Sequence, residues 1–215
     1  MMRYLCIYLI IISASTAQEC TKLVADIIFA IDQSNSIESE KKFKLELDFV
    51  VKVMKNFDVG PDETRVGAVV FSDEADRVLE LKDGMSKDDV IQRIHGIRWD
   101  RGNTFIDKAF VKMGEGFSTE NGGRPNQVPQ IAVLVTDGVA TNPYRALKEA
   151  NKLKNNGVEI FTIGVKSARL SQLNELSSDP PSQHVLSVDS LEVLSSIVST
   201  LSNRVCSSIK RKQPR

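Results

Sequence analysis

Apolar segments typical of buried strands alternate along this chain with segments whose apolar residues recur at helical spacing. Residues 24–31 form a nearly unbroken apolar run, and residues 130–136 form the most apolar segment beyond residue 17. In residues 40–57 the apolar positions lie three and four apart, which predicts an amphipathic helix. The same patterns predict strands at 24–31, 65–71, 75–81, 130–136, 158–165 and 185–188, and helices at 40–57, 87–95, 105–115, 143–156, 169–176 and 190–205.

This alternation predicts an α/β fold, doubly wound and Rossmann-like, with helices on both faces of a mostly parallel central sheet. The link at residues 72–74 is too short for a parallel crossover, so 75–81 is expected to be a short antiparallel edge strand. In open sheets of this kind, ligands bind at the carboxyl ends of the strands. Those ends are therefore the expected place for a functional site.

The first 17 residues have the order of a secretory signal peptide. Arg3 makes the start basic, residues 4–12 are apolar, and Ser15 and Ala17 have the spacing of a cleavage site. A membrane anchor is the alternative, but it needs roughly 18 apolar residues, about twice this run. We expect a secreted, extracellular chain without a membrane span, divided into a signal peptide at 1–17, one domain at 18–206 and a basic tail at 207–215.

Two cysteines, Cys20 and Cys206, remain once Cys6 is removed with the signal peptide. An even pair in an oxidising compartment predicts one disulfide, which would bring the two ends of the domain together. Two free thiols are the alternative.

Charge is unevenly distributed, although the chain as a whole is neutral. Residues 18–206 carry 23 Lys and Arg against 28 Asp and Glu, so the domain is acidic and is not expected to bind nucleic acid. The tail carries only basic charges, at Lys210, Arg211, Lys212 and Arg215. We expect it to be a solvated end. A glycosaminoglycan contact or a dibasic processing site at Lys210-Arg211 is the alternative.

A carboxylate and two hydroxyls follow the first predicted strand at alternate positions, as Asp32, Ser34 and Ser36. Such hard oxygen donors suit Mg²⁺, Mn²⁺ or Ca²⁺. The same residue types are common in turns and helix caps, so this loop alone leaves both interpretations open.

Asp137 follows the 130–136 strand in the same way and precedes Gly138. If the two strands are neighbours, Asp32 and Asp137 lie about 5 Å apart across the sheet. Two carboxylates at that distance repel each other, and a cation would offset the repulsion. The alternative is that Asp137 caps the start of a helix.

Together with Thr104, these residues resemble the metal-ion-dependent adhesion site of the von Willebrand factor type A domain. The resemblance covers residues 22–206 and rests on Asp32-x-Ser34-x-Ser36, on Thr104 within 102–109, and on Thr136-Asp137-Gly138. The loop at 122–125 and the flanking cysteine pair are also similar to that family. The loop around Thr104 departs from the family's commonest form, with Asn103 in place of Gly and Ile106 in place of Thr.

The resemblance implies a role for each of the five residues. Ser34 and Ser36 would bind the metal directly, Thr104 directly or through water, and Asp32 and Asp137 largely through water. Mg²⁺ is the expected cation, with Mn²⁺ or Ca²⁺ as alternatives, and it would keep one coordination position open. An acidic residue of an extracellular protein, such as a collagen or another matrix protein, is the expected occupant of that position.

Residues around this site are candidates for contact with the partner: Asn35, Trp99, Asp100, Arg101, Asn103 and Thr141. Trp99 is the only tryptophan, and an aromatic residue beside Arg is typical of interface hot spots. The alternative is that Trp99 covers the core from the loop side. His95 and His184 lie outside the motif and are expected to be surface or structural residues.

These features favour an extracellular, cation-dependent protein-binding module for adhesion or matrix assembly. A structural matrix component that assembles independently of the metal site is the alternative. The sequence carries no Gly-x-Ser-x-Gly, phosphate-binding loop or His-Glu-x-x-His, so we expect no enzyme, with a metal-dependent hydrolase as the third hypothesis. The oligomeric state is left open.

Overall fold

A single six-stranded sheet forms the centre of the computed structural model, which describes residues 20, 22–83 and 86–213. The expected signal peptide at 1–17 lies outside the described residues. The strands are β1 (Asp26–Asp32), β2 (Arg65–Phe71), β3 (Ala75–Leu79), β4 (Gln130–Thr136), β5 (Glu159–Val165) and β6 (Val185–Val188). Their order across the sheet is β3-β2-β1-β4-β5-β6, and every pair is parallel except β2 with β3. The predicted mostly parallel sheet with one antiparallel edge strand is confirmed.

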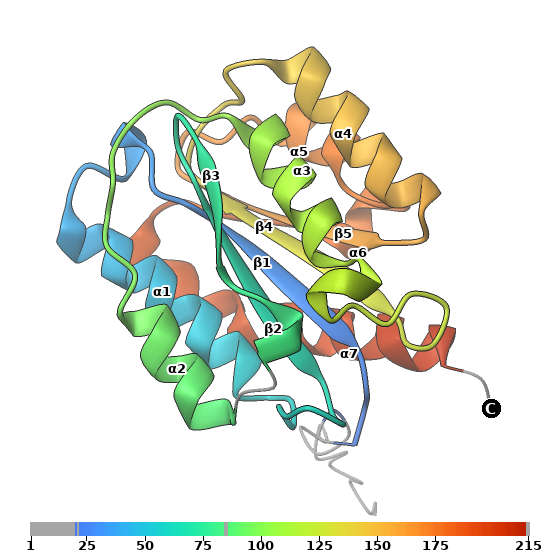
Figure 1. Cartoon of the computed structure of the whole chain (residues 1–215). Helices are drawn as coiled ribbons and strands as arrows, with labels where there is room; N and C mark the ends of the chain where they lie inside the picture. The colour runs from blue at the N-terminus through green and yellow to red at the C-terminus, as the bar shows by residue number, and fades with distance from the viewer. Residues whose placement is uncertain (1–19, 21, 84–85, 214–215) are drawn as a thin grey trace, which may run out of the picture.

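Helices cover both faces of this sheet. They are α1 (Glu40–Met54), α2 (Lys87–His95), α3 (Ile106–Gly116), α4 (Pro143–Asn155), α5 (Leu170–Leu176), α6 (Pro181–His184) and α7 (Val198–Lys212). Helices α1, α2 and α7 pack on one face, and α3, α4 and α5 pack on the other (Figure 1). Every residue of β1, β4 and β5 is buried, because a strand covered on both sides has no solvent face.

Side-chain caps start α1 and α4, the helices that follow β1 and β4. Ser39 accepts a hydrogen bond from the Lys42 backbone N–H at the start of α1. Asn142 does the same for Arg145 at the start of α4, where Pro143 occupies the first helical position. These caps define where the loops after β1 and β4 end.

The last helix differs from its prediction at both ends. The segment expected to be one helix at 190–205 begins as a 3₁₀ helix, Leu191–Ile197, and continues as α7 as far as Lys212. Arg211 Nη2 lies 2.9 Å from Glu159 Oε1 and Lys212 Nζ lies 3.1 Å from Glu159 Oε2. These ion pairs, together with basic charge in the last turn of a helix, favour a helix that extends beyond residue 205, while Lys210, Arg211 and Lys212 are exposed to solvent.

Buried polar contacts and a disulfide hold the end of the sheet where β1 begins. Cys20 and Cys206 are joined by a disulfide, with their Cα atoms 5.5 Å apart. Arg124 donates from its Nε and its backbone N–H to the buried carboxylate of Asp26. His184 is buried, with Nε2 2.7 Å from Glu159 Oε1, so it is a structural residue.

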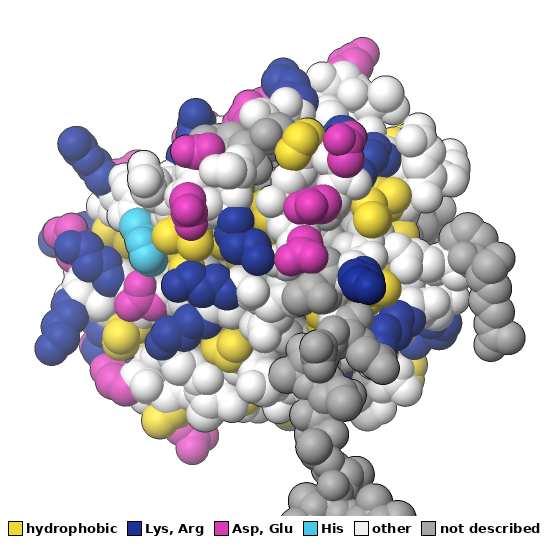
Figure 2. All heavy atoms as spheres, turned by 90° about the horizontal axis from the view of Figure 1, so that it is seen from below, with side chains coloured by type: hydrophobic (Ala, Val, Ile, Leu, Met, Phe, Trp, Pro, Cys, Tyr) yellow, Lys and Arg dark blue, Asp and Glu magenta, His cyan; other side chains and the backbone are white. Residues whose placement is uncertain are grey.

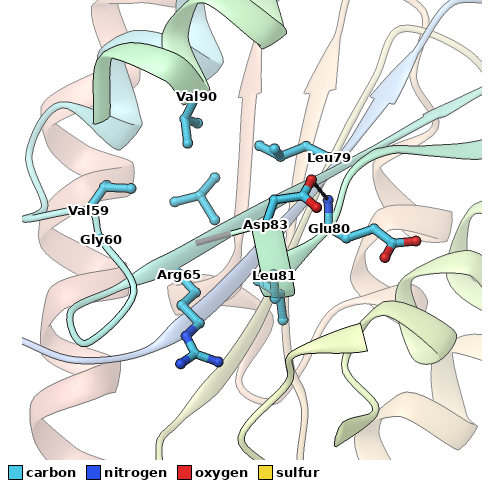
Figure 3. Close-up of a pocket in the computed structure, with 9 residues that line it drawn as sticks. Val59, Gly60, Arg65, Leu79, Glu80, Leu81, Asp83 and Val90 are labelled. Atoms are coloured by element: carbon cyan, nitrogen blue, oxygen red, sulfur yellow. Dashed lines mark hydrogen bonds between the residues drawn. The ribbon is translucent and has the colours of Figure 1, made fainter. Parts of the chain in front are cut away.

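The surface at this end of the sheet carries charges of both signs among the described residues. Figure 2 shows it from below, with Lys and Arg side chains interspersed with Asp and Glu over the described residues in view. A small cavity beside the start of β2 is lined by Val59, Leu79, Leu81 and Val90 (Figure 3). It encloses about 10 Å³, room for at most a single water. In the described part of the chain no helix is both long enough and apolar enough to cross a membrane.

Candidate metal centre

Three loops converge at the carboxyl ends of β1 and β4. The two strands are adjacent and parallel, with Ile31 paired to Val135, so the residues that follow them meet at one edge of the sheet. Asp32 is the last residue of β1, and Asp137 comes directly after β4. The neighbouring strands on which the sequence argument depended are therefore present in the structure.

Asp32 is fully buried, and its two carboxylate oxygens bind the loop after β1 and the end of β4. Oδ1 accepts a hydrogen bond from the Ser34 backbone N–H at 2.8 Å. Oδ2 accepts one from the Thr136 hydroxyl at 2.6 Å. The Asp32 side chain thereby fixes the start of the loop after β1 against the end of β4.

The two serines of the first loop lie next to each other and against the second aspartate. Ser34 Oγ and Ser36 Oγ are 2.8 Å apart. Ser36 Oγ also donates a hydrogen bond to Asp137 Oδ1. Two hydroxyl oxygens from the loop after β1 and a carboxylate from the loop after β4 are thus grouped in one place.

Thr104 comes from the loop before α3 and reaches the same place. A Cβ atom added at Gly138 would lie 3.0 Å from Thr104 Oγ1 and 3.4 Å from Ser36 Oγ, so both hydroxyls border that glycine. The Thr104 backbone N–H donates to Thr141 Oγ1 at 3.1 Å, and the Thr141 N–H donates to the Thr104 carbonyl at 2.9 Å. A larger residue at 138 would crowd the site.

Burial opposes ionisation of both aspartates. It raises the pKa of Asp32 to about 6, against the opposing effect of the hydrogen bonds from Ser34 and Thr136. Burial also raises the pKa of Asp137, although the Ser36 hydrogen bond and the nearby Lys166 favour its charged form. Burial thus destabilises the charged forms of two carboxylates that lie beside three hydroxyls. A divalent cation suits this place, because its positive charge would stabilise both carboxylates.

The donor set is rich in hydroxyls, which restricts the cations that fit. Among the described residues no three His, Cys, Asp or Glu side chains gather as a metal site. The five oxygen-bearing residues together offer two carboxylates and three hydroxyls, all hard donors. This chemistry fits Mg²⁺ or Mn²⁺ and disfavours cations that prefer sulfur ligands.

The residues proposed for partner contact surround this cluster, and several also stabilise the loops. Trp99 is half-buried against the core and donates from Nε1 to the Ser34 carbonyl at 3.4 Å, with the Arg101 guanidinium 4.8 Å from its ring. Asn103 donates from its side chain to Asp73 Oδ1 at 2.6 Å. Trp99 therefore covers the core from the loop side and also borders the site, while Asn35, Asp100, Arg101, Asn103 and Thr141 are exposed.

Sequence reasoning gave no site role to three residues beside the cluster. Thr136, the last residue of an apolar strand, binds Asp32. Glu46 is buried in α1 and accepts a hydrogen bond from the Asp32 backbone N–H. Lys166, after β5, forms an ion pair with Glu38 in the loop after β1. Only Thr136 carried a sequence signal, since it directly precedes Asp137.

The fold and this cluster belong to one family. Residues 26–200 match the von Willebrand factor type A domain. The chain therefore belongs to that family, whose members are adhesion and matrix modules and not enzymes.

The relatives include matrix collagens and matrilins. The chain is 30% identical over 190 residues to the collagen alpha-4(VI) chain of Mus musculus, spanning 87% of this chain and 8% of that one. It is 30% identical over 198 residues to Mus musculus matrilin-2, spanning 90% and 20% of the two chains. The chain thus spans a small part of the length of these relatives.

Solved structures of a mussel protein have the same fold. Proximal thread matrix protein 1 from the mussel byssus superimposes with a TM-score of 0.81 at 26% identity, covering 87% of this chain and 49% of the mussel chain. A second structure of that protein, at 25% identity and also with a TM-score of 0.81, has zinc in its metal-ion-dependent adhesion site.

Proposed function

We propose that this chain is an extracellular module that binds a protein partner through a divalent cation. The observation that carries the proposal is the convergence of Asp32, Ser34, Ser36, Thr104 and Asp137 from three loops at the carboxyl ends of β1 and β4. Membership of the type A domain family and the metal-occupied site of the mussel relative support it.

In this proposal each residue has a chemical task. Ser34, Ser36 and Thr104 offer hydroxyl oxygens to the cation, and Asp32 and Asp137 balance its charge, in part through water. A bound Mg²⁺ or Mn²⁺ would supply an electrophilic centre that attracts a carboxylate oxygen. We infer Mg²⁺ as the cation, since it tolerates a site that keeps several waters.

The partner in this proposal is a matrix protein, such as a collagen, that presents an acidic residue. The rim residues Asn35, Asp100, Arg101, Asn103 and Thr141 would contact the surrounding partner surface, with Trp99 providing apolar area at the edge. Secretion, expected from residues 1–17, is supported by the disulfide of Cys20 with Cys206 and by the matrix relatives.

The test combines direct cation binding with partner capture. We expect the secreted chain to bind Mg²⁺ or Mn²⁺ in calorimetry and to retain a matrix protein from tissue extract in Mg²⁺ but not in chelator. Asp32→Ala should abolish both, because Asp32 fixes the loop after β1 against the end of β4. Asp88→Ala, at an exposed position of α2, serves as the matched control and should change neither.

Two results would contradict the proposal. One is partner capture that is equal in Mg²⁺ and chelator. The other is self-association of the chain that chelation leaves unchanged, which is what the alternative of a metal-independent structural matrix component predicts.

A further inference from the structure

Glu46 is a carboxylate on the apolar face of a core helix. Only 1% of its surface is exposed, and its neighbours on the buried face of α1 include Phe43, Leu47 and Val50. Burying a carboxyl group among apolar side chains costs free energy, and an apolar residue would suit the helix better. The presence of Glu46 therefore calls for an explanation other than packing.

The Glu46 side chain makes a hydrogen bond to a residue of the metal centre. Its Oε1 accepts from the backbone N–H of Asp32 at 3.1 Å, so the carboxylate holds the point where β1 passes into the first site loop. In the described part of the chain, its Oε2 is buried and has no hydrogen-bond partner.

Two other buried carboxylates of this chain have basic partners. Asp26 is paired with Arg124, and Glu159 is paired with Arg211. Burial, together with the nearby carboxylates of Asp32 and Asp137, raises the pKa of Glu46 well above the usual range, which favours the neutral form of its carboxyl group. The link between Glu46 and the metal centre is therefore the hydrogen bond to the Asp32 backbone, and not a charge.

We propose that Glu46 is a positioning residue of the metal centre, whose carboxyl group accepts the hydrogen bond from the Asp32 backbone and so holds the start of the first site loop in place for a divalent cation. The inference rests on the proposed function, because it requires a cation at the cluster. It adds a residue from outside the three loops, supplied by the helix that packs beneath them.

Glu46→Gln keeps the hydrogen bond on which the inference rests. Glutamine has the size of the glutamate side chain and an oxygen that accepts from the Asp32 N–H. We expect its dissociation constant for Mn²⁺, measured by calorimetry on the full secreted chain, to stay close to that of the wild type. The melting temperature in chelator should stay the same or rise, since a buried carboxyl group is removed.

Two further variants complete the experiment. Glu40→Gln removes a charge from an exposed position of the same helix and should change the Mn²⁺ dissociation constant less than about twofold, because exposed charges are screened. Glu46→Met restores an apolar helix face but removes the acceptor, and its dissociation constant should rise about tenfold, as is typical when a group supporting metal ligands is lost. A loss of affinity in Glu46→Met that Glu46→Gln avoids identifies the hydrogen bond as the cause, and Glu46→Met remains decisive where Glu46→Gln does not fold.

The outcomes distinguish this inference from the proposed function. A wild-type chain that binds no Mn²⁺ would overturn the proposed function. Wild-type binding that Asp32→Ala abolishes, together with an unchanged dissociation constant in folded Glu46→Met, would overturn the role of Glu46 alone. A merely structural Glu46 would alter the melting temperature and leave Mn²⁺ affinity as it is.

Discussion

Asp32 combines complete burial with a negative charge and has no basic partner in its hydrogen bonds. Its carboxylate accepts from the Ser34 N–H and the Thr136 hydroxyl, and burial still raises its pKa to about 6. A carboxyl whose pKa is higher in the folded state binds its proton more tightly there than in the unfolded chain. Its ionisation therefore destabilises the fold, and the cost is complete once the pH exceeds the folded-state pKa.

The pH dependence of stability follows from this shift. In chelator, the Asp32 contribution to the free energy of unfolding should fall as the pH rises from about 4 to about 6, by an amount on the order of 3 kcal/mol. Urea unfolding at several pH values measures it as the difference between the wild type and Asp32→Asn. Adding Mg²⁺ at pH 7 should restore stability to the wild type and not to the variant. Parallel pH profiles for the two proteins would contradict this account.

Residues of the site differ in how readily their sequence reveals them. Asp32, Ser34 and Ser36 stand in a loop after an apolar strand, where oxygen donors at alternate positions are conspicuous. Glu46 stands inside a helix in which acidic residues usually face solvent, so helical periodicity alone does not predict its burial. Its contact with Asp32 depends on how α1 packs against β1, which a local pattern does not contain.

At the level of elements, local sequence patterns predict where most strands and helices begin and end. They do not predict the end of α7. The strands agree with prediction to within a few residues, because apolar runs act locally. The continuation of α7 to Lys212 depends instead on Glu159, which is distant in sequence. Tertiary ion pairing thus accounts for a helical end that local patterns did not predict.

Glu159 should therefore be needed to hold α7 against the sheet. Burial opposes its ionisation, yet hydrogen bonds from His184, Ser208 and Lys212 outweigh that effect and lower its pKa to about 2. Glu159→Gln should reduce the free energy of unfolding at pH 7 by on the order of 2 kcal/mol, since three polar partners lose their charged acceptor.

The pH profile tests the cause of that loss. A carboxyl with a lowered pKa stabilises the fold above its unfolded value, and this contribution disappears as the pH falls from about 4.5 towards about 2. The wild type should lose its advantage over Glu159→Gln in that range, as measured by urea unfolding. A difference that persists undiminished at pH 2 would show that shape, and not charge, is responsible.

Across the whole molecule, the candidate metal centre lies at one end of the sheet, and the disulfide and the buried polar contacts lie at the other. The site loops follow the carboxyl ends of β1 and β4, while Cys20 precedes the amino end of β1 and is joined to Cys206 of α7 (Figure 1). The topology that separates them was predictable from strand-helix alternation. The order in which strands lie side by side was not, because it depends on how the helices cross over the sheet.

This separation predicts that stability and cation binding respond differently to loss of the disulfide. The bridge closes a loop of 186 residues, so the chain-entropy model assigns it about 5 kcal/mol as an upper estimate. The double variant Cys20→Ser with Cys206→Ser should therefore melt at a much lower temperature. Its Mn²⁺ dissociation constant, measured by calorimetry well below the melting temperature, should stay within about twofold of the wild type, since the bridge and the site residues lie at opposite ends of β1. A large loss of affinity in the folded double variant would instead reveal coupling between the two ends of the sheet through β1, and cation binding would then raise the melting temperature of the bridged and unbridged chains unequally.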